Sequence, residues 1–206
     1  MWSVELKTRT GEVSTHLGDG PNRIHAEVHP TATLDASQGP IAIGHGTKVC
    51  ENAVIRGPVI IGEGCIIGTN TVIRGATFIG DKVLIGNGAE VKNAIIEDEA
   101  SLGPYSYVAD SIIREAVFLG ALVRTSNYRL DDRNIEVMNA LGERVDSGTM
   151  KLGACIGKRA KLGVGCIVFP GRTIAADSQF GPGINITKNL PTARYSLRQE
   201  LSTSNL

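Results

Sequence analysis

Residues 41–92 read IAIGHGTKVCENAVIRGPVIIGEGCIIGTNTVIRGATFIGDKVLIGNGAEVK, and an aliphatic residue recurs at every sixth position of this stretch. The recurring positions are Ile43, Val49, Ile55, Ile61, Ile67, Ile73, Ile79, Ile85 and Val91. A period of six fits neither the 3.6-residue repeat of an α-helix nor the two-residue alternation of a single strand. It fits a chain that runs straight, turns a corner and runs straight again, with three such stretches to a coil. The stretch therefore predicts an all-β chain that folds as a left-handed parallel β-helix of hexapeptide repeats, with coils about 4.8 Å apart.

A glycine directly follows several of these aliphatic residues, at Gly44, Gly62, Gly68, Gly80 and Gly86. Glycine adopts positive φ at no steric cost, so we expect these glycines at corners that need positive φ. A small residue stands four places after each aliphatic residue, and we expect it to point inward beside the aliphatic side chain. The core is then a stack of aliphatic rungs, which agrees with an aromatic content of only 4%.

The hexads also predict how the chain is divided. We expect an N-terminal edge strand or cap over residues 1–23, the β-helix over residues 24–190 in roughly eight coils, and a polar tail over residues 191–206. The repeat is lost between Thr125 and Lys151, and unstructured connections of this length are uncommon and often functional. This charged interruption predicts a protruding arm at about residues 125–151 that contacts a neighbouring subunit of a homotrimer.

Composition restricts the partners. The chain has 206 residues, with 21 Lys and Arg against 21 Asp and Glu, so its formal net charge is zero. A neutral balance gives no reason to expect nucleic acid or an anionic membrane as a partner. No apolar run approaches the roughly 18 residues of a membrane span, and residues 1–11 have no signal-peptide core. We therefore expect a cytoplasmic protein that binds neither a membrane nor nucleic acid.

No metal site is expected. The cysteines lack the paired spacing of metal ligands, and no three of the four histidines have the spacing of zinc ligands on a β-helix. In a reducing cytoplasm we expect the cysteines to act as structural filler. They are Cys50, Cys65, Cys155 and Cys166.

One corner of the predicted coil collects cations. Residues 18 apart stack on each other, and the residue after the aliphatic position is Arg56, then Arg74, then Lys92. Like charges stacked about 5 Å apart repel each other. Two interpretations remain open: an anion lies across this ladder, since Arg suits phosphate geometry, or the ladder is solvated and balanced by carboxylates of a partner chain.

Several segments resemble a known family, the C-terminal β-helix of bifunctional sugar-1-phosphate nucleotidylyltransferase/glucosamine-1-phosphate N-acetyltransferases, within the hexapeptide-repeat acyltransferase superfamily. The resemblance runs from about residue 43 to residue 190, and its most specific parts are VIRG at 72–75, AEVKN at 89–93, SYVADS at 106–111 and TSNYRLDD at 125–132. It implies a homotrimer whose acetyl-transfer sites lie between subunits, with acetyl-CoA along the later coils.

The resemblance also implies roles for single residues. Arg74, Lys92 and Tyr107 match positions that hold the sugar phosphate, which favours the anion interpretation of the ladder. Asn127 matches a catalytic residue near the sugar amine. The backbone around Ala154 and Val164 corresponds to contacts with the thioester arm of acetyl-CoA.

Two departures from the family matter. Pro104 stands where the family has its general-base histidine, and proline cannot accept a proton. Asp110 and Glu136 are the nearby candidates for a replacement base, although neither occupies the family position. The second departure concerns length, because 206 residues leave no room for a nucleotidyltransferase domain, so uridylyl transfer is not expected.

The sequence therefore predicts an acyl-CoA-dependent acyltransferase, acting as an N-acetyltransferase on a sugar phosphate or a nucleotide sugar. The alternative is a catalytically inactive β-helix that lost its histidine and serves in sugar-phosphate binding, assembly or regulation, for example beside a separate nucleotidyltransferase. A purely structural β-helix is the third interpretation.

Overall fold

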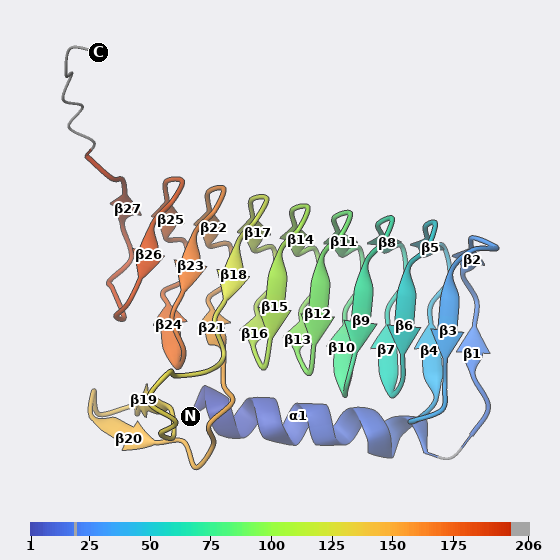
Figure 1. Cartoon of the computed structure of the whole chain (residues 1–206), viewed down its shortest axis with the longest axis horizontal. Helices are drawn as coiled ribbons and strands as arrows, with labels where there is room; N and C mark the ends of the chain where they lie inside the picture. The colour runs from blue at the N-terminus through green and yellow to red at the C-terminus, as the bar shows by residue number, and fades with distance from the viewer. Residues whose placement is uncertain (19, 199–206) are drawn as a thin grey trace.

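In the computed structural model, which describes residues 1–18 and 20–198, the chain forms a parallel β-solenoid with one N-terminal helix (Figure 1). Three parallel sheets form its sides, with eight, nine and eight strands, against the roughly eight coils expected from the hexads. Each coil gives one short strand to each sheet, so residues 17 or 18 apart lie side by side. The β-helix that the hexads predict is confirmed.

We name the sheets A, B and C in the order in which each coil visits them. Sheet A contains β1 (Arg23–Ile24), β4 (Ile41–Ile43), β7 (Val59–Ile61), β10 (Thr77–Ile79), β13 (Ile95–Ile96), β16 (Ile112–Ile113), β21 (Ala154–Ile156) and β24 (Arg172–Ile174). Sheet B contains β2 (Glu27–Val28), β5 (Lys48–Val49), β8 (Ile66–Ile67), β11 (Leu84–Ile85), β14 (Ser101–Leu102), β17 (Phe118–Leu119), β22 (Lys161–Leu162), β25 (Gln179–Phe180) and β27 (Arg194–Tyr195). Sheet C contains β3 (Thr33–Asp35), β6 (Val54–Arg56), β9 (Val72–Arg74), β12 (Glu90–Lys92), β15 (Tyr107–Ala109), β18 (Arg124–Thr125), β23 (Ile167–Val168) and β26 (Asn185–Ile186).

The aliphatic residues of the hexads form the core of the solenoid. All nine are buried, with at most 2% of their surface exposed. The small residues four places later point inward as well, as the full burial of Thr47 and Cys65 shows. Burial raises the pKa of the thiol of Cys65 and of the equivalent Cys166. The core is therefore the stack of rungs that the repeat predicts.

The corner glycines serve a different purpose from the one expected. None of the five glycines that follow a hexad aliphatic residue has a positive φ, so that expectation is wrong. A Cβ atom on Gly62 would instead lie 2.7 Å from the carbonyl carbon of Gly80 in the next coil. The left-handed residues come two places later, at Gly64 (φ 64°) and Lys82 (φ 54°). These glycines are needed because successive coils approach so closely at the corner.

The N-terminal segment is a helix, and the edge strand expected over residues 1–23 is wrong. Helix α1 (Trp2–Leu17) lies along the outer face of sheet A, against β7, β10 and β13 (Figure 1). Its buried residues are Trp2, Leu6, Thr10, Val13 and Leu17. Their spacings of three and four follow the helical period, so they form one apolar face. No helix among the described residues is long and apolar enough to cross a membrane.

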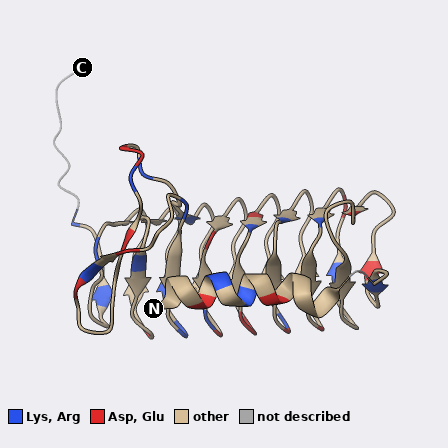
Figure 2. Ribbon diagram, turned by 90° about the horizontal axis from the view of Figure 1, so that it is seen from below, with Lys and Arg blue, Asp and Glu red and all other residues tan. Residues whose placement is uncertain are grey.

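An ion-pair network fixes α1 to the solenoid. Arg114 donates from Nη2 to Glu5 Oε2 at 2.6 Å and from Nη1 to Glu97 Oε1 at 2.9 Å, and Arg9 Nη1 donates to the same Glu97 oxygen at 2.7 Å. Hydrogen bonds from Arg114 hold the pKa of Glu5 below its ordinary value. Charged residues of both signs line the exposed side of the helix (Figure 2).

The arm leaves the solenoid after β18 and returns at β21. It contains an antiparallel hairpin of β19 (Glu136–Met138) and β20 (Arg144–Asp146). We expected it to lack a core of its own, but Ile135, Val137 and Leu152 are buried together with Trp2 and Leu6 of α1. The arm base therefore packs against α1 and sheet A of the same chain.

Candidate functional site

Three neighbouring strands of sheet C, β9, β12 and β15, carry the cation ladder. Their register places Lys92 directly beside Arg74, and Tyr107 beside Glu90. One coil earlier Arg56 ends β6, which pairs with β9. The stacking of residues 18 apart is confirmed. It places the cations at the edge of sheet C where the chain turns toward sheet A.

Each cation of the ladder has a carboxylate partner from its own chain. Arg74 Nε donates to Glu90 Oε1 at 2.8 Å, and Lys92 Nζ donates to Asp110 Oδ2 at 3.4 Å. Arg56 lies 3.9 Å from Asp35. The carboxylates of a partner chain, which one interpretation required, are therefore not needed for balance. The side chain of Arg74 remains 38% exposed and that of Lys92 23% exposed, so both can still reach a ligand.

Asp110 is the best-ordered acceptor of this cluster. Its side chain is 6% exposed. Besides Lys92, it accepts hydrogen bonds from Asn93 Nδ2 at 2.8 Å and from Asn127 Nδ2 at 2.5 Å. Asp110 adopts a left-handed conformation with φ 48°, which turns its main chain toward sheet A. All three neighbours donate to this carboxylate, so it orients Lys92 and Asn127 rather than standing free beside a substrate.

Tyr107 completes the cluster on the outer face of sheet C. Burial raises the pKa of its phenol, and the negative charges of Glu90 and Asp110 raise it further. Arg74 and a hydrogen bond with Asn127 act in the opposite direction. The phenol is therefore neutral near pH 7 and can donate a hydrogen bond to an anion. Sequence reasoning thus brought five residues together correctly, and it missed Glu90 and Asn93, which lie inside the motifs that carried the resemblance.

A cavity of about 310 Å³ adjoins the cluster where α1, the arm and the solenoid meet. Its lining includes Asn93 and Asp110 from the corner, Lys7 and Thr10 from α1, and Lys151 from the arm. Lys7 could not be assigned to this place from the sequence, because the helix that carries it was not expected.

Pro104 lies at the opposite end of the same strand. It stands in the corner between β14 and β15, where its carbonyl oxygen accepts from the main-chain N–H of Leu122 at 2.9 Å. The cluster around Asp110 follows β15, so the two ends are separated by the strand, about 10 Å at the usual rise per residue. Within one chain Asp110 therefore does not occupy the place of the missing histidine. Glu136, the other candidate base, lies on β19 and lines a different cavity at the arm.

The two residues expected near acetyl-CoA lie on different sides of the solenoid. Ala154 is fully buried in β21, and its N–H donates to Ser111 Oγ at 3.0 Å. Val164 is 51% exposed at the corner between sheets B and C. A Cβ atom on Gly120 would lie 2.8 Å from Val164 N, and one on Gly86 would lie 2.6 Å from Pro104 N, so both residues belong to the stacked corner that precedes sheet C. Val164 thus shares an edge with Pro104, whereas Ala154 does not.

Comparison with known proteins gives one family profile and several relatives. The profile of the GMPPB C-terminal domain matches residues 55–151, which include the ladder and most of the arm. The chain is 43% identical over 190 residues to the uncharacterized acetyltransferase YaiX of Escherichia coli O6:K15:H31 (strain 536 / UPEC), which covers 92% of this chain and 82% of that protein.

A bifunctional sugar-1-phosphate nucleotidylyltransferase/acetyltransferase of Sulfurisphaera tokodaii is 36% identical over 101 residues, which cover 49% of this chain and 25% of that protein. Among solved structures, the Arabidopsis UDP-N-acetylglucosamine acyltransferase matches 84% of this chain and 70% of its own, with 15% identity and a TM-score of 0.45. The match to YaiX therefore covers nearly the whole chain, and the match to the bifunctional enzyme about half of it.

Proposed function

Because the chain belongs to the family of hexapeptide-repeat β-helix acetyltransferases that includes YaiX, we propose that it transfers an acetyl group from acetyl-CoA to an amino sugar that carries a phosphate or a nucleotide. The observation that carries the substrate class is the cluster of Arg74, Lys92 and Tyr107 on the outer face of sheet C. These side chains offer two positive charges and a neutral phenol on one surface, the donors that a phosphate monoester accepts from.

The carboxylate partners of the ladder do not exclude a phosphate. Arg74 and Glu90 are each more than a third exposed, and exposed ion pairs contribute at most about 1 kcal/mol. A phosphate can therefore replace Glu90 beside Arg74 at little cost. Glu90 then has room to turn outward, since no other side chain of the described residues donates a hydrogen bond to it.

The geometry of sheet C also supports an acceptor of this size. The phosphate lies at the edge with Arg74 and Lys92, and the reacting amine lies toward the edge with Pro104 and Val164. About 10 Å of strand separates the two edges, a length that a hexose phosphate spans. Asn127, held by Asp110, offers its amide oxygen to the substrate.

In the reaction the amine nitrogen attacks the carbonyl carbon of the thioester. The C–N bond forms, the C–S bond breaks, and the proton from nitrogen ends on the departing thiolate of CoA. With proline at residue 104, no side chain takes the proton at the family's position. A general base contributes about 10²–10⁴-fold, so we expect slow turnover.

A second candidate function rests on the same proline. The chain binds a sugar phosphate or a nucleotide sugar without acylating it, and serves in assembly or regulation. The in-chain carboxylate pairs support this candidate, because a ladder balanced at rest is stable without turnover.

The proposal includes a homotrimer. The outer face of sheet B carries an apolar stripe of Ile66, Leu84 and Phe118, which are 45%, 41% and 47% exposed. The register aligns these residues across β8, β11 and β17, with Ser101 between the last two. Sheet A is partly covered by α1 and sheet C carries the candidate site, so sheet B is the face left for contact between subunits. A ring of three closes without a free interface.

The test is release of free thiol from acetyl-CoA in the presence of glucosamine 1-phosphate, glucosamine and glucose 1-phosphate. We expect release with glucosamine 1-phosphate and little with the other two, which lack the phosphate or the amine. Release that is equal with glucosamine and glucosamine 1-phosphate would contradict a role for the ladder. Phosphate-dependent binding without release would favour the second candidate.

A further inference from the structure

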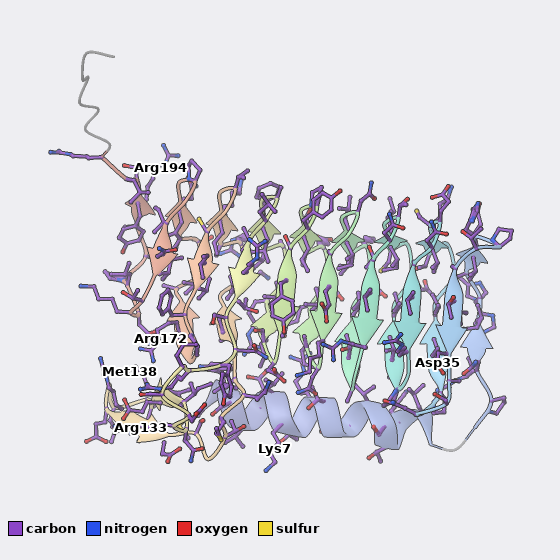
Figure 3. All side chains as sticks on the ribbon, in the orientation of Figure 1. Lys7, Asp35, Arg133, Met138, Arg172 and Arg194 are labelled. Carbon is purple, nitrogen blue, oxygen red and sulfur yellow. The ribbon has the colours of Figure 1, made fainter. Side chains whose placement is uncertain are left out.

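A second cationic site lies outside the ladder, at the base of the arm. Here a cavity of about 630 Å³ is bounded by the start of the arm, the hairpin and the last strands of sheets A and C. Three guanidinium groups line it: Arg129 from the arm, Arg144 from β20 and Arg172 from β24. Figure 3 shows Arg172 beside the arm residues Met138 and Arg133, far from Arg194 at the other side of the coil. We call this place the arginine cavity.

The three arginines differ in how their charge is balanced. Arg129 forms a two-point pair with Asp131, at 2.8 Å and 2.5 Å. Arg144 lies 3.7 Å from Glu136, a long and exposed pair. Arg172 donates only to main-chain oxygens, those of Pro170 at 3.0 Å and Glu136 at 2.9 Å, and forms none of the ion pairs within residues 1–18 and 20–198.

Arg172 is therefore a costly charge in the unliganded protein. Burial lowers the pKa of its guanidinium, and the positive charge of Arg144 lowers it further, with a smaller effect from Arg129. Each cation of the ladder has a carboxylate within 3.9 Å, whereas Arg172 has like charges around it. An anion that enters the cavity relieves this repulsion, which makes the arginine cavity a stronger anion site than the ladder.

The cavity is built rather than incidental. Gly171, with φ 75°, precedes Arg172, and a Cβ atom there would lie 2.7 Å from Ile135 Cγ2 and would overlap the main-chain oxygen of Glu136. Ile135 and Val137 on either side of Glu136 are buried, so the hairpin is anchored. The carbonyl that positions Arg172 is thus held in place before any ligand arrives.

Aromatic surface adjoins the charges. Phe169 and Tyr128 line the cavity and remain 41% and 37% exposed. Exposed rings beside arginines suit a flat heterocycle next to phosphate groups. The volume lies within the range of sites that enclose small-molecule ligands.

From this geometry we propose that the arginine cavity binds a nucleoside diphosphate group, with its phosphates on Arg172 and Arg144 and its base on Phe169. Two sources share this chemistry, the nucleotide end of coenzyme A and the nucleotide of a nucleotide sugar. The inference concerns binding and goes beyond the proposed reaction, so it stands if no acetyl transfer takes place.

Isothermal titration calorimetry of the full chain tests it, with UDP, ADP, CoA, inorganic phosphate and uridine as separate probes. We expect UDP, ADP or CoA to bind more tightly than phosphate or uridine alone. The variant Arg172→Gln should weaken this binding roughly 10- to 100-fold, the equivalent of one lost charge-assisted contact. The control Arg194→Gln, an exposed arginine on sheet B, should bind as the wild type does. Tighter binding of CoA than of UDP assigns the cavity to the acyl donor, and the reverse assigns it to the acceptor.

Further variants keep the test independent of folding. Arg144 is exposed, so Arg144→Gln leaves the fold intact and should weaken binding as well. Phe169→Leu should weaken UDP or ADP several-fold and leave phosphate unchanged. Absence of nucleotide binding at millimolar concentration, unchanged binding in both arginine variants, or equal affinity for UDP and inorganic phosphate would each overturn the proposal. None of these results bears on thiol release with glucosamine 1-phosphate, so the two proposals fail separately.

Discussion

At the scale of single residues, the proposed site depends on charges that are already paired. The paired state explains how a ladder of like charges is stable without a ligand, because each cation has a carboxylate nearby. It also sets the test of substrate binding, since a phosphate has to compete with Glu90 for Arg74.

The first prediction concerns Arg74. Replacing it by Gln should weaken binding of glucosamine 1-phosphate roughly 10- to 100-fold, because one charge-assisted contact is lost. The matched control is Arg56→Gln, one coil earlier in the same ladder and outside the cluster, which should have little effect. Titration calorimetry measures both, and the Arg74 effect should decrease with added salt. Equal effects of the two variants would mean that the ladder acts only through its overall charge.

The second prediction concerns Asp110. In Asp110→Asn the amide presents a donor to three groups that already donate, and Lys92 loses its partner. We expect the free energy of unfolding to fall by about 1–3 kcal/mol, the usual penalty for leaving buried polar groups unpaired. Urea denaturation measures this loss. The variant Asp98→Asn, at a corner away from the cluster, is the control, and an equal loss there would contradict the assigned role of Asp110.

At the scale of elements, α1 and the arm hold each other against sheet A. The single tryptophan of the sequence, Trp2, is 9% exposed at their junction and therefore reports on it. Ion pairs and apolar contacts both contribute, and only the ion pairs depend on pH.

The third prediction follows from Glu5 and Glu97. Hydrogen bonds from Arg114 hold the pKa of Glu5 below its ordinary value of 4.5. Burial raises the pKa of Glu97, but the hydrogen bonds from Arg9 and Arg114 outweigh it and the net shift is downward. A depressed carboxyl pKa stabilises the folded state above the unfolded value, and this stability is lost as the pH falls. Trp2 fluorescence should therefore report loosening of α1 below about pH 4.5.

The control for this experiment is Arg114→Met, which removes the partner that lowers both pKa values. In this variant the acid transition of Trp2 fluorescence should be smaller, because the stability that the pairs supply is already absent at pH 7. An acid transition of unchanged size would show that the ion pairs do not hold α1.

The elements that the sequence predicted are those that repeat. Ile43 to Val91 predicted the coils because one inward aliphatic residue per stretch is a periodic demand of the core. Helix α1 was missed although its buried positions follow the helical period, because Thr10 lies on the buried face and Gly11 in mid-helix weakens the pattern. The apolar contacts of Ile135 and Val137 in the arm were missed as well, since their partners lie on α1.

The site was predictable to the same degree. The 18-residue step placed Arg74 beside Lys92, because stacking of coils is part of the repeat. The pairing of Lys92 with Asp110 depends on side-chain conformation, which no period encodes. The arginine cavity combines Arg129, Arg144 and Arg172 from outside the regular hexads, so only the folded arm brings them together.

At the scale of the whole molecule, stability is spread along a stack of similar coils. In such a solenoid each coil contacts only its neighbours, so a local defect has a local cost. The two surfaces that remain for function are the outer faces of sheets B and C.

The fourth prediction compares two neighbours on β6. Ile55 is fully buried and Val54 is half-buried. Ile55→Ala should lower the free energy of unfolding by about 2–5 kcal/mol, because a cavity remains in a core that cannot collapse. Val54→Ala should cost clearly less. Urea denaturation of both variants checks the inward orientation of the hexad residue, and equal losses would contradict it.

The fifth prediction concerns assembly. Phe118→Glu places a charge in the apolar stripe of sheet B, and burying an unpaired charge is costly. We expect light scattering to give a trimer for the wild type and a smaller species for the variant, with an unchanged circular dichroism spectrum. Lys161→Glu on the same sheet, beside Phe118 in the register, is the control for added negative charge. A wild-type monomer at micromolar concentration would contradict the trimer.

The central claim is that the outer face of sheet C holds the phosphate of an amino sugar. The most direct measurement is a crystal structure of the protein soaked with glucosamine 1-phosphate and coenzyme A. We predict density for the phosphate within hydrogen-bond distance of Arg74 and Lys92, with Glu90 turned away. A structure in which the ligand binds elsewhere, while Arg74 stays on Glu90 and Lys92 on Asp110, would contradict the claim.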